Sequence, residues 1–381
     1  MPDNSTKSNS ITPESLRVAK GLVGVPLRRN QHNRLVSAPS IKRWARSIGD
    51  RNPLWLDADY AANSGLGRIV APPCWLYSVD NTCLAAKFPD CHVIYGGCDW
   101  EFYGWLSEGD SVSAQSRLTS VEEKTGRFCG SMVLQTGETL FSGPGGKLVA
   151  KAVSYVLRTP RPQAVEIGKY RDWRKYVLTP EEAKAIEDAY DNEEIRGVQP
   201  RFWEDVSPGE NLTPIVRGPL TSEEVIQFLG STSPSLGFRR FLRFRKRHPE
   251  AAFLDEDTGS WESWEASMLR DDVAQAFGFP FAHDSGIDRI SWLGNLLTNW
   301  MGDQGTLKTL SIRLALPNVY GDVSWCRGKV TRKYQQDGQS LCDLEVWCDN
   351  QRGQQTAQGT ATLALPVNVS SQGMGGRHGI S

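Results

Sequence analysis

Hydrophobic and polar positions follow the same order twice along the chain. In each half, a short amphipathic stretch (40–48; 222–229) precedes a longer apolar stretch of helical character (73–86; 286–301). Segments with alternating apolar and polar residues complete each half. Alternation with period two predicts strands, and apolar positions three and four apart predict helices. The pattern therefore predicts an α+β protein made of two similar units, each with a long central helix and an antiparallel sheet.

A weak internal repeat supports this division. Asp110 closes an EGD turn before the alternating SVSAQSRL, and Asp322 closes a YGD turn before VSWCRGKV. Gly146 and Gly353 open the last predicted strand of each half. Both pairs are separated by about 210 positions, and a constant spacing between similar blocks is the mark of a duplicated unit.

Boundaries between the predicted parts fall in polar or charged segments. In chain order the parts are a disordered N-terminus (1–20), an N-terminal unit (21–157), a connecting segment (158–211), a C-terminal unit (212–368) with an insertion (234–265), and a disordered tail (369–381). The insertion contains the basic run FRRFLRFRKRH. A solvated helix face and an anion-binding site both remain open for this run.

Composition and charge narrow the classes of partner that the chain is expected to bind. The chain is 39% hydrophobic and 23% charged with a formal net charge of −1, so charge gives no reason to expect binding to nucleic acid or to a membrane. Neither an apolar leader nor a run of 18 apolar residues occurs. We expect a cytoplasmic protein, with a peroxisomal or matrix location left open. The eight cysteines form no C-x-x-C pair, which predicts buried thiols, no metal site and no cofactor motif.

Several separated blocks resemble the MaoC-like dehydratases of the fatty-acid-synthase-like N-terminal type. The blocks are IKRWARSIGDRNPLWLDADYAANSGLGRIVAPP (41–73), HDSGIDRISWLGNLLTNWMGD (283–303), RLALPNVYGDVSWCRGK (313–329) and the NQRG turn (350–353). The resemblance implies a tandem, or double, hotdog fold, in which an antiparallel sheet wraps a long central helix in each half.

The family's acid/base pattern is incomplete in this chain. Relatives hydrate or dehydrate acyl thioesters with an Asp and a His five residues apart in G-D-x-N-P-x-H. Here Asp50 and Asn52 match, but Trp55 stands at the His position, and Met268 falls on that position in the second half. An indole nitrogen cannot accept a proton. The resemblance implies a catalytic role for Asp50, while a turn-forming carboxylate remains the alternative.

His283 is the histidine best placed to replace the missing base. His283-Asp284 corresponds to Pro72-Pro73 of the first half and leads into the second long helix. The positive end of a helix favours a neutral imidazole, which can accept a proton. Asp284 and Arg289 are predicted to orient a substrate. A packed helix-start residue is the alternative interpretation of His283.

The remaining residues predicted to contact a substrate lie around these two places or on the aromatic strand 99–105. The substrate-binding set is Asn52, Trp55, Pro73, Trp75, Trp100, Tyr103, Met268, Gly286, Arg289 and Trp292. Ordinary core packing is the alternative role for the aromatic members.

Three functions remain open. The favoured one is an enzyme of secondary metabolism that orients an apolar substrate for a cyclisation, a pericyclase-type (Diels–Alderase) cycloaddition or an isomerisation, without a strong base. The second is an acyl-CoA hydratase or dehydratase in which Asp50 or His283 replaces the lost base. The third is a non-catalytic acyl-binding subunit. The expected ligand is an apolar or acyl small molecule, with a CoA thioester left open, and a homodimer is compatible with all three functions.

Overall fold

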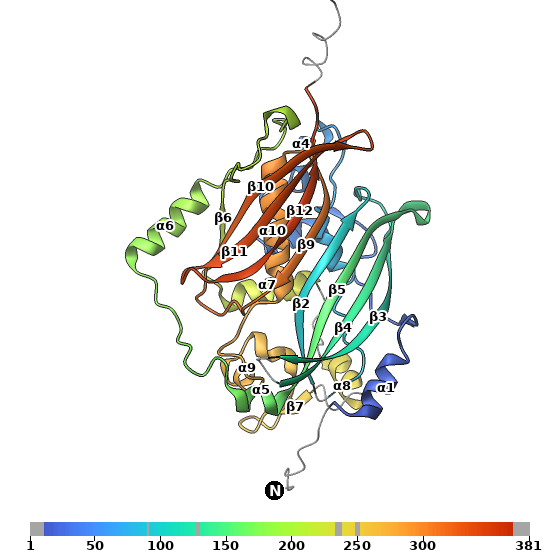
Figure 1. The fold of residues 1–381 in the computed structure, drawn as a ribbon, viewed down its shortest axis with the longest axis vertical. Helices are drawn as coiled ribbons and strands as arrows, with labels where there is room; N and C mark the ends of the chain where they lie inside the picture. The colour runs from blue at the N-terminus through green and yellow to red at the C-terminus, as the bar shows by residue number, and fades with distance from the viewer. Residues whose placement is uncertain (1–10, 90, 127–129, 233–237, 248–251, 369–381) are drawn as a thin grey trace, which may run out of the picture.

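A computed structural model describes residues 11–89, 91–126, 130–232, 238–247 and 252–368. Ten strands form one sheet in the order β1-β3-β4-β5-β2-β9-β12-β11-β10-β6 (Figure 1). The first half supplies β1 (Pro26–Leu27), β2 (Cys91–Phe102), β3 (Ser113–Gly126), β4 (Gly130–Ser142) and β5 (Leu148–Pro160). The second half supplies β6 (Ile215–Arg217), β9 (Thr306–Leu314), β10 (Ser324–Gln336), β11 (Gln339–Asn350) and β12 (Gln355–Ala364). A separate hairpin joins β7 (Ala252–Leu254) to β8 (Trp261–Ser263).

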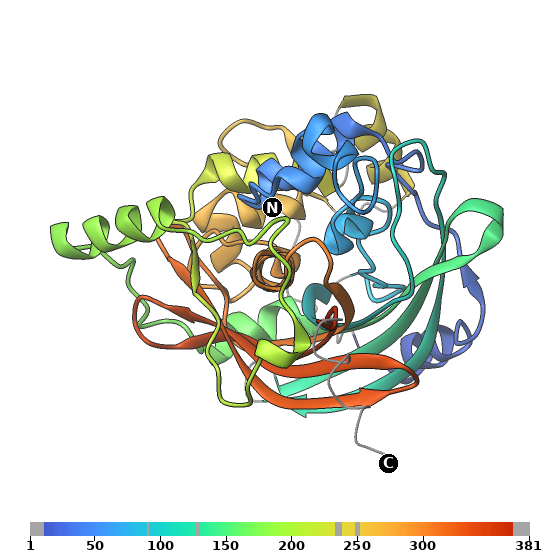
Figure 2. The same ribbon diagram turned by 90° about the horizontal axis from the view of Figure 1, so that it is seen from above.

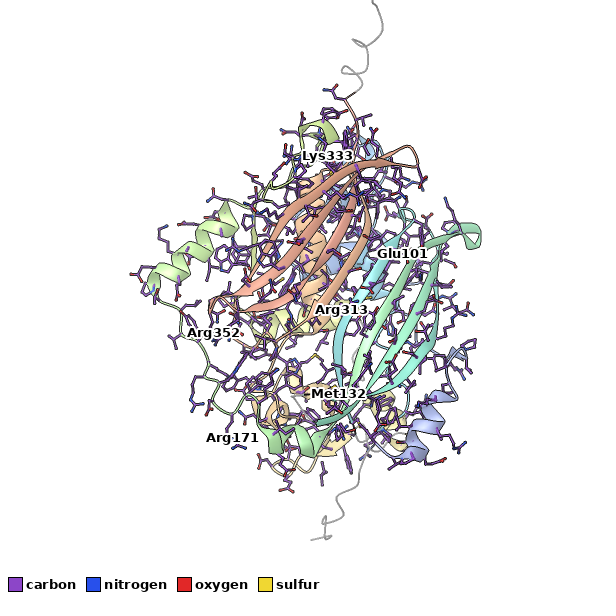
Figure 3. The ribbon with its side chains drawn as sticks, viewed as in Figure 1. Glu101, Met132, Arg171, Arg313, Lys333 and Arg352 are labelled. Carbon is purple, nitrogen blue, oxygen red and sulfur yellow. The ribbon has the colours of Figure 1, made fainter. Side chains whose placement is uncertain are left out.

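The two half-sheets meet where β2 pairs antiparallel with β9. The pairing runs from Gly97 opposite Arg313 to Glu101 opposite Thr309, and Figure 3 marks Arg313 and Glu101 at this seam. Gly97 has a φ of 144°, and a Cβ there would lie 2.2 Å from the Ile312 carbonyl oxygen. Glycine therefore permits the close approach of the two backbones at the centre of the sheet.

Helices gather on one face of the curved sheet (Figure 2). The helix at the centre is α10 (Gly286–Met301), in which every residue from Ile287 to Met301 is buried. Since α10 is buried on all sides, its polar residues, such as Asp288, Arg289 and Asn295, are enclosed together with its apolar ones. This is the α+β arrangement predicted from the sequence.

The other helices are short. The α-helices are α1 (Pro13–Lys20), α2 (Ala38–Ser47), α3 (Pro53–Leu56), α4 (Ala58–Ala62), α5 (Arg161–Ile167), α6 (Pro180–Asp191), α7 (Ser222–Thr232), α8 (Phe238–Arg247) and α9 (Asp271–Gln275). The 3-10 helices are η1 (Pro73–Ser78), η2 (Pro144–Gly146), η3 (Trp203–Asp205) and η5 (Trp264–Met268). Within the described part of the chain, no helix has the length and apolar character needed to cross a membrane.

The first half lacks the long central helix that was predicted over 73–86. Only η1 forms there. The Asp80 side chain accepts the Thr82 N–H at 2.8 Å, the Asn81 side chain accepts the Cys83 N–H at 3.1 Å, and Arg29 donates to both side chains. Side chains that bind the backbone two residues onward compete with helix formation. The prediction of a long central helix is therefore wrong for the first half.

Aromatic rings pack beside η1 instead. Tyr77 meets Trp100 edge to face at 4.9 Å between ring centroids, and the Trp100 indole donates to the Tyr77 hydroxyl at 2.8 Å. Trp100 also stacks on Phe141, and Trp44 lies 5.7 Å from Phe228. Trp100 is therefore part of the core, which was the alternative role for the aromatic residues.

The chain ends differ partly from prediction. Residues 13–20, assigned to a disordered terminus, form α1, because Thr12 and Ser15 cap it reciprocally. That prediction is wrong for these residues. Residues 1–10 and the predicted tail 369–381 lie outside the described residues.

We expect Gly97→Ala to destabilise the fold, because its Cβ would overlap the Ile312 carbonyl oxygen across the seam. The free energy of unfolding should fall by about 2 kcal/mol or more in urea titrations. Gly104→Ala is the control, since a Cβ there meets nothing within 4 Å. Equal stability of the two variants would contradict this account of the seam.

Candidate functional site

Two turns fix the loop that carries Asp50. The Asp50 N–H donates to the Ala45 carbonyl at 2.8 Å, at the end of α2. One oxygen of Asp50, Oδ1, accepts the Asn52 N–H at 2.9 Å, and the Asn52 side chain accepts the Leu54 N–H at 2.9 Å to begin α3. These side-chain-to-backbone bonds make a rigid turn. Asn52 was predicted to bind substrate, but its side-chain oxygen is the acceptor in this cap.

The Asp50 carboxyl is buried with one oxygen unused. Asp50 is 2% exposed, and its Oδ2 accepts no hydrogen bond of regular geometry from the described residues, although the Trp55 indole is close enough to lower the Asp50 pKa. Burial raises the pKa of Asp50 to about 7, although the Asn52 N–H, the Trp55 indole and the Arg217 guanidinium lower it in part. A carboxyl with this pKa can both accept and donate a proton near neutral pH.

Other unpartnered polar groups lie on the neighbouring elements. The indole nitrogens of Trp55, Trp75 and Trp44 and the Ser78 hydroxyl are buried without a hydrogen-bond partner in the described structure. They lie on α2, α3 and η1, and α2 contacts the other two. Buried polar atoms normally have partners, so a group of unpartnered ones marks a place where a ligand or water supplies them.

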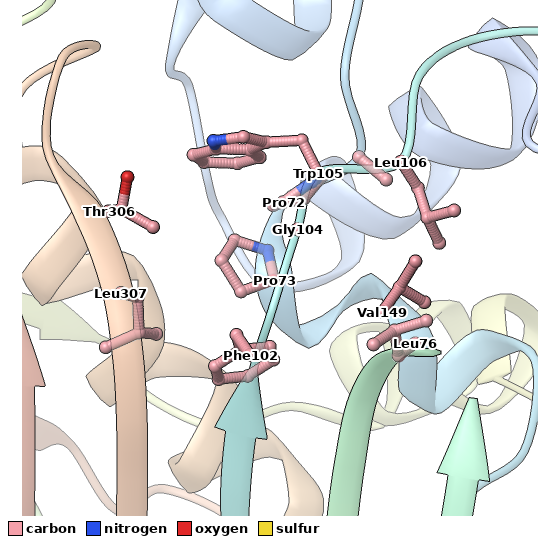
Figure 4. A pocket seen from close by; sticks show the side chains of 11 residues that line it. Pro72, Pro73, Leu76, Phe102, Gly104, Trp105, Leu106, Val149, Thr306 and Leu307 are labelled. Carbon is pink, nitrogen blue, oxygen red and sulfur yellow. The ribbon is translucent and has the colours of Figure 1, made fainter. Parts of the chain in front are cut away.

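An apolar cleft borders the same 3-10 helix. Beyond the last paired residues, Glu101 and Thr309, strands β2 and β9 separate. The cleft opens there, and only about 30 Å³ of it is accessible to a water-sized molecule (Figure 4). Its lining residues are Ala71, Pro72, Pro73, Leu76, Phe102, Gly104, Trp105, Leu106, Val149, Thr306 and Leu307. Cys74, a buried thiol next to Pro73, has its pKa raised by burial and by the charge of Asp50, so the cleft and Asp50 both adjoin η1.

His283 lies at the start of α10, away from this group. Its Nδ1 is 2.7 Å from the Asp284 carbonyl oxygen, so Nδ1 carries the hydrogen and Nε2 the lone pair. Nε2 is buried and has no hydrogen-bond partner within the described residues. Burial lowers the pKa of His283 to about 4. The imidazole is therefore neutral, as predicted, although burial is the main reason.

Asp284 and Arg289 form a buried ion pair. Arg289 Nε donates to Asp284 Oδ2 at 2.8 Å, and the guanidinium also donates to the Leu316 and Thr356 carbonyls. Burial raises the pKa of Asp284 to about 6 against the lowering effect of Arg289. The hydrogen-bonding groups that were predicted to orient a substrate thus join α10 to the sheet, and a substrate role for them stays a prediction.

The remaining predicted site residues are dispersed. Gly286 packs against Leu314, Trp292 is buried on α10, and the Met268 carbonyl accepts the Tyr320 hydroxyl. Tyr103 is half-exposed and donates to Glu101. The structure thus gathers Asp50, Asn52, Trp55 and Trp75 at one place, and His283, Asp284, Gly286 and Arg289 at another.

Sequence reasoning missed three polar residues next to Asp50. They are Arg217 on β6, Glu193 in the connecting segment and Asn295 on α10, and hydrogen bonds join them. No local motif marks them, because each comes from a separate part of the chain. An arginine at the end of a short strand and an asparagine within an otherwise apolar helix were the available signals.

Comparisons with known proteins agree with this fold. Residues 22–152 match the model of the FAS1-like, dehydratase domain region. A probable enoyl-CoA hydratase alpha subunit of Thermomonospora curvata is 25% identical over 173 residues, which cover 40% of this chain and 48% of that protein. The chain thus spans about half the length of that relative.

Two solved structures share the fold across most of the chain. A MaoC-like dehydratase superposes with a TM-score of 0.65 at 17% identity, covering 92% of this chain and 100% of that one. A double hotdog protein of Mycobacterium tuberculosis gives a TM-score of 0.53 at 11% identity, covering 87% and 92%.

These findings confirm the resemblance seen in the sequence. The chain has the double hotdog fold of the MaoC-like dehydratases. Its N-terminal half contains a FAS1-like dehydratase region, the segment that carries Asp50 and Trp55. Dehydratases and hydratases of this kind are lyase-type enzymes.

We expect His283→Gln to weaken the rise of stability between acid and neutral pH. The folded chain keeps His283 neutral down to about pH 4, whereas the unfolded chain binds a proton below about 6.5. Stability therefore rises with pH across this window, by up to about 3 kcal/mol from His283 alone. Urea titrations at pH 4.5 and 7 measure this difference. An equal rise in both proteins would contradict a buried neutral imidazole.

Proposed function

We propose that this chain is a lyase-type enzyme that hydrates or dehydrates an acyl thioester, with Asp50 as its acid and base. The observation that carries the proposal is the buried Asp50 carboxyl with a free Oδ2 and a pKa of about 7. The FAS1-like dehydratase region around it and the similarity to an enoyl-CoA hydratase subunit support the same chemistry.

A single carboxyl can carry out both proton transfers if the Cα hydrogen and the β-hydroxyl lie on the same face of the substrate. In dehydration, the Asp50 carboxylate takes the proton from Cα and the bond between Cβ and its hydroxyl breaks. The protonated Asp50 then gives that proton to the departing oxygen, so water leaves, a C=C bond forms and Asp50 regains its charge. Hydration runs the same steps in reverse. The Trp55 indole can donate a hydrogen bond to the oxygen without exchanging a proton.

We place the acyl group at the cleft beside η1, which has to widen to admit it. Its wall is almost entirely apolar, with Phe102 and Trp105 from β2 and the following loop, and Leu307 from β9. Apolar lining with a few polar groups nearby is typical of small-molecule sites. We propose an acyl thioester as substrate, with coenzyme A as its carrier, and a homodimer as the assembly.

A second candidate is the base-independent cyclisation, cycloaddition or isomerisation favoured by the sequence. The specific observation in its favour is Trp55 at the place of the family's histidine, since its indole N–H and those of Trp44 and Trp75 have no hydrogen-bond partner within the described residues. Such donors can polarise a carbonyl in an oriented substrate without proton transfer. The similar proteins reported above are named for hydration or dehydration and give no support to this second chemistry.

The third hypothesis is a non-catalytic acyl-binding subunit. It predicts that the protein binds an acyl ligand without turnover.

We expect Asp50→Asn to abolish hydration of crotonyl-CoA or a longer enoyl-CoA. Loss of the proton-transfer group should reduce kcat/KM roughly 10²- to 10⁴-fold. For the unmodified enzyme, kcat/KM should rise with pH to a plateau with an apparent pKa of about 7, because the carboxylate is the active form. Asp59→Asn, at an exposed carboxylate of α4, is the control.

Two outcomes would argue against the proposal. Undiminished hydration by Asp50→Asn would remove Asp50 from the chemistry. Tight binding of a neutral polyene without turnover of any thioester would favour the second candidate.

Trp55→His is expected to raise the hydration rate, because it restores a base at the family's position. The gain should be roughly tenfold or more, within the usual contribution of general base catalysis. Trp55→Phe removes the indole N–H without adding a base and serves as the matched variant. If Trp55→His is no faster than Trp55→Phe while both remain folded, the pairing of residue 55 with Asp50 is wrong.

A further inference from the structure

A buried ion pair lies behind the Asp50 loop. Arg217 donates to both carboxylate oxygens of Glu193, each at 3.0 Å, and the two side chains are 4% and 1% exposed. Arg217 ends β6 in the second half, and Glu193 follows α6 in the connecting segment. Neither residue belongs to the half that carries Asp50. A buried pair adds little net stability over apolar packing, so stability alone gives it no evident purpose.

Arg217 binds the backbone of the Asp50 loop directly. Its Nε donates to the Ile48 carbonyl at 2.9 Å, two residues before Asp50. Gly49 lies between them with a φ of 70°, and a Cβ there would lie 3.0 Å from Arg217 Nε. The guanidinium is thus packed against the loop so closely that the intervening residue needs to be glycine. A contact between halves therefore sets the position of Asp50.

The pair is itself held by α10. Arg217 also donates to the Asn295 side chain, the Asn299 amide donates to Glu193 at 2.9 Å, and the Asn295 amide donates to Asn299 at 3.2 Å. The two asparagines of α10 are thus both partners of the buried pair. Because every charged group in the network has partners, the geometry of the pair is fixed.

Groups from four sides act on Asp50. Arg217 on β6 lowers its pKa and Glu193 in the connecting segment raises it, while the Trp55 indole on α3 also lowers it. On η1, burial raises the pKa of the Cys74 thiol, which leaves that neighbour neutral at physiological pH. Arg51, next along the chain, is exposed and its guanidinium donates to the Tyr190 carbonyl. The buried pair therefore places two opposite charges near the carboxyl, and their effects on its pKa oppose each other.

We propose that Arg217 and Glu193 are positioning residues for Asp50: Arg217 clamps the Asp50 loop through the Ile48 carbonyl, Glu193 holds Arg217, and the pair places opposite charges beside the carboxyl. The consequence for catalysis rests on the proposed function. The titration of Asp50 itself does not, because it needs no substrate.

Substitutions at the two partners should move the Asp50 titration in opposite directions. Glu193→Gln leaves the positive charge of Arg217 unbalanced, which favours the carboxylate and lowers the titration midpoint. Arg217→Gln leaves the negative charge of Glu193 and raises the midpoint. Each should change the proton-binding constant about tenfold, a usual size for a charge close to a buried group. The infrared carbonyl band of the protonated carboxyl, assigned by its absence in Asp50→Asn, measures the midpoint.

Three further variants separate charge from position. Glu194→Gln, at the exposed neighbour of Glu193, should leave the midpoint unchanged. Arg217→Lys keeps the charge but lacks the Nε that binds Ile48, so it should keep the midpoint and lose kcat. The double variant Arg217→Gln/Glu193→Gln should return the midpoint toward that of the unmodified protein while kcat stays low. Circular dichroism and urea titration confirm that each variant is folded.

The proposal is overturned if both single substitutions of folded protein shift the midpoint in the same direction or leave it unchanged. Failure of the proposed function looks different. In that case, the unmodified protein hydrates no thioester, yet the two midpoints still move apart. Conversely, hydration that depends on Asp50 with unmoved midpoints removes the role of the ion pair alone.

Discussion

The pairing of β2 with β9 is the constraint on which the rest of the structure depends. It joins two half-sheets into one sheet of ten strands and gives them a common interior, which α10 fills from the second half alone. The first half, with only η1 at the matching place, fills its share of the interior with aromatic rings. Where the paired strands separate beyond Glu101, the cleft opens beside η1. The site is therefore a product of the junction rather than of either half.

Two buried carboxyls show why the environment decides their roles. Asp284 is almost completely buried and meets a guanidinium at 2.8 Å, so its charge is compensated and its oxygens are bound. Asp50 is equally buried, but its cation, Arg217, binds Glu193 and the loop backbone instead. Burial without a direct cation raises the pKa of Asp50, and only its Oδ1 accepts a hydrogen bond of regular geometry from the described residues. This contrast favours Asp50 over Asp284 as the reacting group.

Much of the fold could be predicted from the sequence because its signals are local. The repeated turns before Ser111 and Val323 and the apolar run of α10 all follow from patterns within a dozen residues. The loss of the first long helix could not be predicted from apolar periodicity. There, Asp80 and Asn81 bind nearby backbone N–H groups, and Arg29, some fifty residues away, holds both in place. In the candidate site, too, some residues follow from local sequence signals and others only from long-range contacts. The missing histidine is visible in the motif around Asp50, whereas Arg217 and Glu193 reach it only through the folded chain.

A crystal structure with a bound, unreactive 3-hydroxyacyl thioester tests the central claim most directly. The account predicts that the acyl group lies in the cleft beside Pro73 and Leu76, with Cα and the β-oxygen within hydrogen-bonding or proton-transfer reach of Asp50 Oδ2. It also predicts that the Trp55 indole faces the same oxygen. A ligand bound at His283, with Asp50 still buried and out of contact with it, would contradict the account.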